Sequence, residues 1–248
     1  MTNASRPEIL ALIPARGGSK GIPRKNLLPI MGQPLIAYSI AQALASRWIT
    51  RVIVSTDDEE IAQVARAHGA EVPFMRPAEY AQDHSLDVDV FRHALATLEA
   101  DEHYTCEAVV HLRPTGPIRQ VARIDEAIAL FLAHPDADSL RSVTVPTHTP
   151  YKMWRRDGEW LVPLLDVPGV DEPFSHPRQA LPKVLWQNGY VDIIRPRVIL
   201  DGGGMAGQRV LAFEMDEPIL ELDYPENIPA IESALRGGTR VAGSRHSS

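Results

Sequence analysis

The hydrophobic positions of the chain alternate between short apolar runs and stretches with helical spacing. The runs lack regular polar alternation, which is typical of strands covered on both faces. They occupy residues 9–15, 52–54, 108–112 and 139–145. Between the runs, apolar residues three and four positions apart predict helices. We expect these helices to begin near residues 33, 58, 88 and 121.

This alternation predicts an α/β fold with a mostly parallel sheet and helices on both faces, a three-layer α/β/α arrangement. We expect residues 7–237 to form a single domain, completed by strands at 188–194 and 210–213 and by a helix at 224–235. In such sheets, ligands bind beyond the carboxyl ends of the strands. A disordered tail is expected at 238–248.

Residues 146–187 have a different character, because prolines interrupt any long regular element there. Trp154, Trp160 and Trp186 also fall in this segment. One interpretation is an irregular excursion packed on the sheet. The other is a lid or a subunit interface, where tryptophan is enriched.

Charge and composition restrict the class of protein. The 248 residues carry a formal net charge of −7, which argues against general nucleic-acid binding. No apolar stretch approaches the ~18 residues needed to cross a bilayer, and the opening residues MTNASRPE do not form a secretory signal. The single cysteine, Cys106, fits a reducing compartment. We therefore expect a cytoplasmic protein with no membrane or nucleic-acid partner.

The segment after the first apolar run, ARGGSKGIPRKN at residues 15–26, is rich in glycines and cations. Glycines let backbone N–H groups approach phosphate oxygens, and cations neutralise the phosphate charge. The spacing fits neither a Walker A loop nor G-x-G-x-x-G. A solvated basic turn would explain the glycines alone. Polyphosphate binding better explains the four cations that converge on this loop, Arg16, Lys20, Arg24 and Lys25.

Two acidic residues near the end of the chain, Glu221 and Asp223, are candidate metal ligands. Because they are two positions apart, a strand would point both side chains the same way. Mg²⁺ takes such oxygen ligands when substrate phosphates complete its shell. Alternatively, they form an acidic cluster that favours the N-terminus of the next helix. This stretch alone leaves both interpretations open.

Other candidate residues fit an ordinary structural role. In LRPTGPIR, residues Arg113, Thr115 and Arg119 follow a buried strand on the expected ligand side, but a proline-rich turn with exposed arginines would look the same. The nine histidines show no metal-binding spacing, and His111 fits a packed strand residue. Asp57 could touch a ligand or cap the next helix, and capping is the commoner role.

Several motifs together resemble the acylneuraminate cytidylyltransferases, the CMP-sialic acid synthetase family. ALIPARGGSKGIPRKN looks like the signature loop of that family. RPAEYAQD, LRPTGPIR, PRQALPKVLWQNG and LELDYPEN follow in the family's order and spacing, so the resemblance covers nearly the whole chain. It implies the fold of nucleotide-diphospho-sugar transferases. It also implies transfer of CMP from CTP to the anomeric hydroxyl of a 2-keto acid sugar, with Mg²⁺ or Mn²⁺ as cofactor and pyrophosphate as product.

Matching positions give the site residues that the resemblance implies. The CTP-binding set would be Ala15, Arg16, Gly17, Gly18, Ser19, Lys20, Lys25, Asn26, Arg76 and Asp87, with the segment 83–87 beside the base and ribose. The acceptor set would be Arg113, Thr115, Lys152, Arg178, Gln179 and Asn188. Glu221 and Asp223 would hold the metal, and the catalytic residues would be Arg16, Lys20 and Asp223. The resemblance also implies a homodimer that includes the excursion, with an anionic sugar acid as second substrate.

The chain departs from the family pattern at four positions. It has Arg113 where glutamine is usual, Gly116 where serine is usual, Asp87 where serine is common, and Glu221 in place of an aspartate. A guanidinium at position 113 offers a planar fork suited to a carboxylate or phosphate, which an amide does not. We therefore expect an acceptor other than ordinary N-acetylneuraminate, such as a legionaminate, a pseudaminate or a different anionic compound.

The sequence leaves two other functions open. One is a CTP-dependent enzyme of the same fold that acts on a 3-deoxy-octulosonate, a sugar phosphate or a phosphonate. The other is a nucleotide-binding module without catalytic activity, although both the basic loop and the acidic pair are retained. The general base is not identified.

Overall fold

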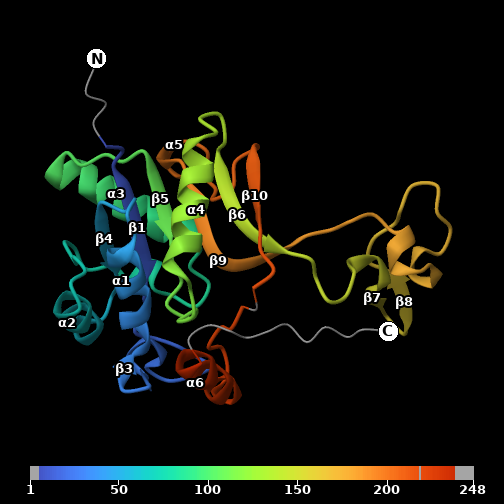
Figure 1. The fold of residues 1–248 in the computed structure, drawn as a ribbon, viewed down its shortest axis with the longest axis horizontal. Coiled ribbons are helices and arrows are strands. Elements are labelled where there is room, and N and C mark those ends of the chain that lie inside the picture. Colours follow the sequence, from blue (N-terminus) through green and yellow to red (C-terminus); the bar gives the residue numbers. More distant parts are fainter. Residues whose placement is uncertain (1–5, 218, 238–248) are drawn as a thin grey trace.

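The computed structural model describes residues 6–217 and 219–237 of the chain. Six strands form one sheet in the order β10-β6-β9-β5-β1-β4 (Figure 1). These strands are β1 (Ile9–Pro14), β4 (Arg51–Ser55), β5 (Ala108–His111), β6 (Ser139–Thr144), β9 (Trp186–Ile194) and β10 (Val210–Glu214). The apolar runs predicted as strands are confirmed, and residues 9–13 are fully buried between two layers of helices.

The sheet is mostly parallel. β1 pairs in parallel with β4 and β5, and β6 pairs in parallel with β10. β9 lies between β5 and β6 and runs antiparallel to both. Its direction follows from the connection, because the chain leaves β6, makes the excursion and returns without a crossover helix that would restore the parallel direction.

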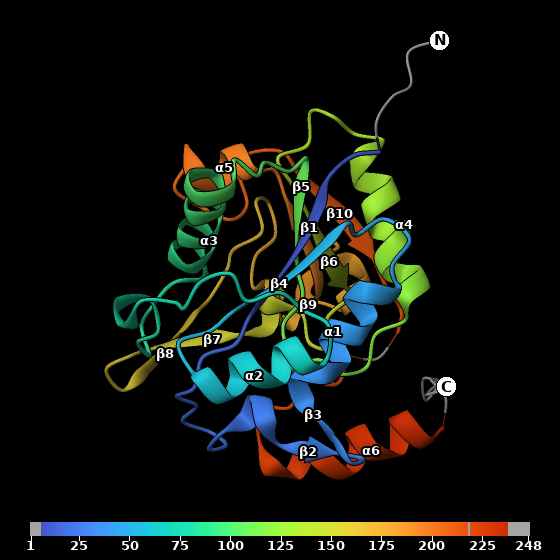
Figure 2. The ribbon, with the colours of Figure 1, turned by 90° about the vertical axis from the view of Figure 1, so that its left-hand side faces the viewer.

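Helices cover both faces of the sheet, which confirms the three-layer α/β/α prediction. One hydrophobic cluster joins the sheet to the first group of helices, α1 (Leu35–Ala45), α2 (Glu59–Ala67) and α4 (Val121–Leu132). A second cluster joins the opposite face to α3 (Asp87–Glu102) and to the short α5 (Pro196–Leu200). Figure 2 shows α3 and α5 on one side of the strands and α1 and α4 on the other. The proline at its first position left α5 without a recognisable helical pattern in the sequence.

A third, smaller hydrophobic cluster holds the basic loop beside the end of the chain. Ile22 and Ile30 pack there against Leu222 and Ile231. The cluster includes a small hairpin and the last helix, namely β2 (Pro29–Ile30), β3 (Gln33–Pro34) and α6 (Ile228–Arg236). Through these contacts, the loop after β1 and the acidic segment 221–223 become neighbours.

The excursion extends away from the sheet instead of packing on it (Figure 1). It contains one hairpin, formed by β7 (Trp154–Asp157) and β8 (Trp160–Pro163). Large apolar side chains there are open to solvent: Trp160 is 77% exposed and Leu161 is 62% exposed. The interpretation of a segment packed on the sheet is therefore wrong, and the alternative of a lid or a subunit interface stays a prediction.

Short 3₁₀ turns complete the fold, at Lys25–Leu27, Ala78–Tyr80, Pro150–Lys152, Pro173–Ser175, Arg178–Ala180 and Pro225–Asn227. The predicted closing helix begins at Ile228, after the last of these turns. Glu221 and Asp223 lie in an irregular segment directly before this last turn, not in a strand. Within the described part of the chain, no helix is long and apolar enough to cross a membrane. The predicted tail, 238–248, lies outside the described residues.

Candidate active site

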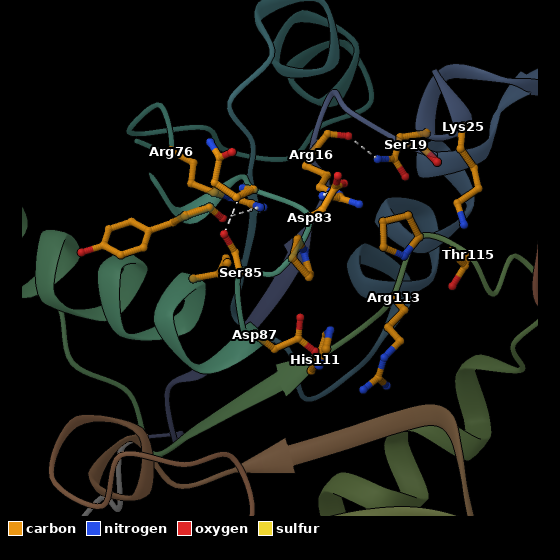
Figure 3. Close-up of a pocket in the computed structure, with 16 residues that line it drawn as sticks. Arg16, Ser19, Lys25, Arg76, Asp83, Ser85, Asp87, His111, Arg113 and Thr115 are labelled. Atoms are coloured by element: carbon orange, nitrogen blue, oxygen red, sulfur yellow. Dashed lines mark hydrogen bonds and ion pairs between the residues drawn. The ribbon is translucent and has the colours of Figure 1, made fainter. Parts of the chain in front are cut away.

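A pocket of about 330 Å³ opens at the carboxyl ends of β1 and β5 (Figure 3). Three segments line it: the basic loop after β1, the segment leading into α3, and the loop after β5. Eight of the expected site residues line this pocket, Arg16, Ser19, Lys25, Asn26, Arg76, Asp87, Arg113 and Thr115. The rest of the wall is Pro14, Tyr80, Gln82, Asp83, Ser85, Val90, His111 and Pro114. The structure thus places the pocket where the strand pattern predicted a ligand.

One hydrogen bond within the basic loop and one to Asp57 outside it fix its backbone. Asn26 Nδ2 donates to the carbonyl oxygen of Arg16 at 3.0 Å, and the backbone N–H of Gly17 donates to Asp57 Oδ1 at 2.9 Å. Asp57 therefore anchors the loop, and the expectation that it caps α2 is wrong. The cap is Asp58, whose Oδ1 accepts from the backbone N–H of Ile61 at 3.0 Å. A turn held from both sides keeps its N–H groups and cations in a fixed arrangement.

The cations of the loop fall into two groups. Arg24 is paired with Asp58 and Glu60 away from the pocket lining, and these contacts raise its pKa. Its inclusion among the polyphosphate-binding cations is therefore corrected: a left-handed backbone at Arg24, with φ of 55°, turns the chain there. Arg16 and Lys25 line the pocket, with Lys20 beside Arg16.

Asp83 bridges two cations of the loop. Its two carboxylate oxygens lie 2.8 Å from Arg16 Nη1 and 2.7 Å from Lys20 Nζ. The hydrogen bonds from Lys20 and then Arg16 hold the pKa of Asp83 below its usual value. In this arrangement an anionic group already sits between the two side chains expected to hold CTP phosphates. Ala15, Gly17, Gly18 and Lys20 belong to the same loop but are not in the pocket wall.

The acidic pair lies next to the loop. Lys25 Nζ is 3.3 Å from Asp223 Oδ1, and the backbone N–H of Leu222 donates to the carbonyl of Thr115 at 2.7 Å. Burial and then the charge of Asp223 raise the pKa of Glu221. Two neighbouring carboxylates that repel each other provide hard oxygen donors for a divalent cation, so the residues present fit Mg²⁺. The described residues contain no cluster of three or more His, Cys, Asp or Glu side chains that could hold a metal ion.

Arg76 and Asp87 lie where the segment before α3 meets the sheet. Burial lowers the pKa of Arg76 to about 10, and its guanidinium donates to Ser55 Oγ at 3.1 Å and to the Ser55 carbonyl. Negative charge on Asp57 and Asp87 opposes this shift. Both side chains line the pocket, and their predicted place beside the base and ribose stays a prediction.

The loop after β5 is held by a buried arginine. Arg119 donates hydrogen bonds to the carbonyl oxygens of Arg113 at 2.8 Å, Tyr190 at 2.6 Å and Gly116. Burial lowers the pKa of Arg119 to about 10. The alternative of exposed arginines in a proline-rich turn is wrong for Arg119. Only glycine fits at position 116 without a shift, since an added Cβ would lie 2.9 Å from Arg119 Nη2.

Four expected acceptor residues lie outside the pocket. Lys152, Arg178 and Gln179 belong to the excursion, where Arg178 donates to the carbonyl oxygens of residues 146 and 147. Asn188 is buried in β9, and its Oδ1 accepts from the backbone N–H of Tyr190 at 3.1 Å. The three excursion residues are thus apart from the pocket of their own chain, whereas Asn188 directly precedes Gly189, whose carbonyl accepts from Arg113 Nη1 at 3.3 Å.

Sequence reasoning missed two charged residues at the site. Asp192, near the end of β9, is buried with its carboxylate 2.9 Å from Arg113 Nη1, and no motif in the strand predicted that contact. Asp83 was included only as the edge of a segment, not as the partner of two cations. His111, interpreted as a packed strand residue, is buried against Phe91 and also reaches the pocket.

Comparisons with known proteins agree with this geometry. The Cytidylyltransferase family model matches residues 10–151. Post-translational flagellin modification protein B of Campylobacter coli is 33% identical over 85% of this chain and 87% of its own length. The CMP-N,N'-diacetyllegionaminic acid synthase of Campylobacter jejuni is 46% identical over 44% of this chain and 47% of that protein. N-acylneuraminate cytidylyltransferase A of Danio rerio is 31% identical over 92% of this chain, which spans 50% of that protein.

A solved structure of CMP:2-keto-3-deoxy-manno-octonic acid synthetase with CTP shares the fold. The TM-score is 0.67, with 18% identity over 93% of this chain and 99% of that chain. At this identity the likeness concerns the fold alone. From the family match and the curated relatives together, the chain belongs to the cytidylyltransferase family of nucleotidyltransferases, and its resemblance to the acylneuraminate cytidylyltransferases is confirmed.

Proposed function

We propose that the protein transfers CMP from CTP to the anomeric hydroxyl of a sialic-acid-like 2-keto-3-deoxy sugar acid. One observation carries the proposal: a single pocket joins the basic loop, the wall around Arg76 and the loop bearing Arg113. In this reaction the acceptor oxygen bonds to the α-phosphorus, and the bond from that phosphorus to pyrophosphate breaks. The hydroxyl proton is released to solvent as the new bond forms. The product is a CMP-sugar, as the names of the curated relatives indicate for those proteins.

The residues of the loop would supply most of the catalysis. Negative charge grows on the departing pyrophosphate, so cations fixed beside it stabilise the transition state more than the ground state. Arg16 and Lys20 are proposed for this role, and CTP phosphates would take the place that Asp83 occupies between them. Mg²⁺ or Mn²⁺ held by Glu221 and Asp223 would neutralise the phosphates and orient them. Positioning and charge account for the acceleration without a covalent intermediate.

We further propose that the protein is a homodimer in which the excursion takes part. Lys152, Arg178 and Gln179 lie on the excursion, apart from the pocket of their own chain. They would meet an acceptor if the excursion of a second copy covered the pocket. The exposed side chains of Trp160 and Leu161 offer apolar surface for such a contact. A molar mass measured by light scattering that equals one chain would contradict this part of the proposal.

The first experiment is pyrophosphate release with CTP, Mg²⁺ and a panel of 2-keto acid sugars, including N-acetylneuraminate, a legionaminate and a pseudaminate. ATP, GTP and UTP serve as nucleotide controls, and Asp223→Asn serves as the matched variant of the acidic pair. Release with CTP and one of these acids, greatly reduced in the variant, would support the proposal. Binding of CTP without release for any acceptor would support a non-catalytic nucleotide-binding module instead.

A second candidate is a CTP-dependent enzyme of the same fold with a different acceptor. The observation that favours it is the fold shared with two structures, the octonic acid synthetase and a 4-diphosphocytidyl-2C-methyl-D-erythritol synthase at a TM-score of 0.65. The panel therefore includes a 3-deoxy-octulosonate, a sugar phosphate and a phosphonate. Turnover of one of these, with none of the nine-carbon acids, would replace the first proposal.

A further inference from the structure

A buried carboxylate lies beside the acceptor end of the pocket. Asp192 on β9 is opposite His111 of β5 on one side and Arg141 of β6 on the other. Cross-strand partners point to the same face of a sheet, so the three side chains lie next to one another. This face is the one covered by α3, because the ring of His111 packs edge-on against Phe91 with 4.7 Å between centroids. Asp192 is only 2% exposed.

The counter-charge of Asp192 comes from arginines, not from the histidine. Arg113 Nη1 is 2.9 Å from Asp192 Oδ2, and Arg141 Nε is 3.9 Å from Oδ1. His111 Nδ1 is 4.0 Å away, too far for a hydrogen bond. Burial, followed by the charges of nearby arginines, lowers the pKa of His111 well below its usual value, so the ring is neutral. Gln187 Nε2 completes the set of donors, at 3.2 Å from Asp192 Oδ1.

These contacts hold Arg113 by one edge of its guanidinium. The same Nη1 also donates to the carbonyl of Gly189 at 3.3 Å. Within residues 6–217 and 219–237, no protein group accepts a hydrogen bond from Nε or Nη2 of Arg113. The side chain is 28% exposed and lines the pocket. Its second edge is therefore available to a ligand, and a guanidinium edge matches two oxygens of a carboxylate.

A second feature at this end also points to a ligand. Both ring nitrogens of His111 are buried and without a hydrogen-bond partner in the described part of the chain, although the residue lines the pocket. Buried polar groups normally find a partner, so this ring has unused hydrogen-bonding capacity. Figure 3 shows His111, Asp87 and Arg113 together at one end of the pocket, apart from Lys25 and Arg76. The carboxyl group of Asp87 does not favour a second carboxylate beside it, so the free edge of Arg113 is the place for one at this end of the pocket.

We propose that Asp192 is a positioning residue that fixes Arg113, and that the free edge of Arg113 binds the carboxylate of the acceptor acid. The proposal deepens the proposed function and rests on it, since it concerns the acceptor of the same reaction. In this arrangement Asp192 does not touch substrate. It holds one edge of the guanidinium so that the other faces the pocket, while the neutral ring of His111 is left to hydrogen-bond an uncharged group of the same acceptor.

The test compares Arg113→Gln, Arg113→Lys and Asp192→Asn with the wild type, using the acid that gives turnover. Arg209→Gln, on an exposed arginine at the far edge of the sheet, is the control. Loss of a bidentate charged contact should raise the acceptor KM roughly 10- to 100-fold, with CTP affinity unchanged within about twofold. Lysine at 113 should not restore it, because lysine keeps the charge but lacks the fork. Asp192→Asn should raise the acceptor KM less.

Two measurements decide the proposal: the coupling between positions 113 and 192 in the acceptor KM, and discrimination against an acceptor analogue without the carboxylate. In the double variant Arg113→Gln with Asp192→Asn, the acceptor KM should be no worse than in Arg113→Gln alone, because both changes remove the same interaction. The wild type should discriminate against an acceptor whose carboxylate is replaced by an amide, and Arg113→Gln should lose most of that discrimination. If Asp192→Asn does not fold, the two Arg113 variants and the amide analogue still decide the carboxylate contact.

Three results would overturn the inference. Effects of the two positions on KM that simply add would show that Asp192 acts independently of Arg113 and does not position it. Equal discrimination against the amide in the wild type and in Arg113→Gln would show that Arg113 does not bind the carboxylate, while the proposed function would stand. Absence of turnover with every acid would remove the proposed function itself and this inference with it.

Discussion

Replacing Arg119 should destabilise the loop after β5, because this side chain holds the loop by hydrogen bonds to its backbone. In Arg119→Met, the carbonyls of Arg113, Gly116 and Tyr190 lose their donor. An orphaned buried carbonyl costs about 1–3 kcal/mol. Against this, the fall of the pKa of Arg119 to about 10 indicates that burial costs the charged form roughly 3 kcal/mol, which the methionine would not carry. The three lost donors outweigh this relief.

We therefore expect Arg119→Met to lower the free energy of unfolding by about 2–4 kcal/mol, or Tm by on the order of 10 °C for a chain of this size. Circular dichroism measures the Tm. Hydrogen exchange at residues 113–119 should be faster in the variant than in the wild type, while exchange in α3 should change less. Arg209→Met is the matched control, since an exposed ion pair contributes about 1 kcal/mol or less. A Tm within about 2 °C of the wild type, with exchange unchanged in the loop, would refute the reasoning.

Three further outcomes follow from the site. Gly17→Ala should weaken CTP binding, measured by calorimetry, because its Cβ would lie 2.7 Å from Asp58 Oδ2; an affinity equal to that of the wild type would contradict this. Asp83→Asn should tighten CTP binding by freeing the two cations that it bridges, and weaker binding would instead make Asp83 part of the nucleotide site. The raised pKa of Glu221 means that folding disfavours its charged form, so Glu221→Gln should raise Tm at pH 7.5 without divalent metal. This gain in Tm should shrink as the pH falls through the raised pKa of Glu221, because the wild-type side chain is then protonated as well. A gain independent of pH would show that the charge of Glu221 is not its cause.

The sequence was sufficient for most of the elements because their apolar patterns are simple. The strands that became β1, β4, β5 and β6 are runs of buried apolar residues, and α2 and α3 have clear helical stripes. The basic loop could also be located, because glycines and cations directly after a buried strand are typical of a phosphate-binding loop. The direction of β9 was beyond such a pattern, since pairing direction depends on the path of the excursion and not on the residues of the strand.

Contacts between distant segments account for the rest of what the sequence did not reveal. The pairing of Asp192 with Arg113 depends on β9 lying next to β5, and the bridge from Asp83 to Arg16 depends on the segment before α3 folding toward the loop. Neither of these two contacts is marked by a motif in the segments that form it. The motifs predicted Lys152, Arg178 and Gln179 as acceptor residues, but the structure places them apart from the pocket. Spacing along the chain does not reveal that the excursion extends away from the sheet.

The pairing of β6 with β9 has a consequence for how such enzymes diverge. The two strands form the arms of one long hairpin, with Thr144 opposite Trp186, and the whole excursion is its loop. The entropy of closing a loop grows slowly, by about 0.6 kcal/mol for each doubling of length. A change in the length of this loop therefore costs the sheet little, so the excursion is the segment in which insertions and deletions should be tolerated best.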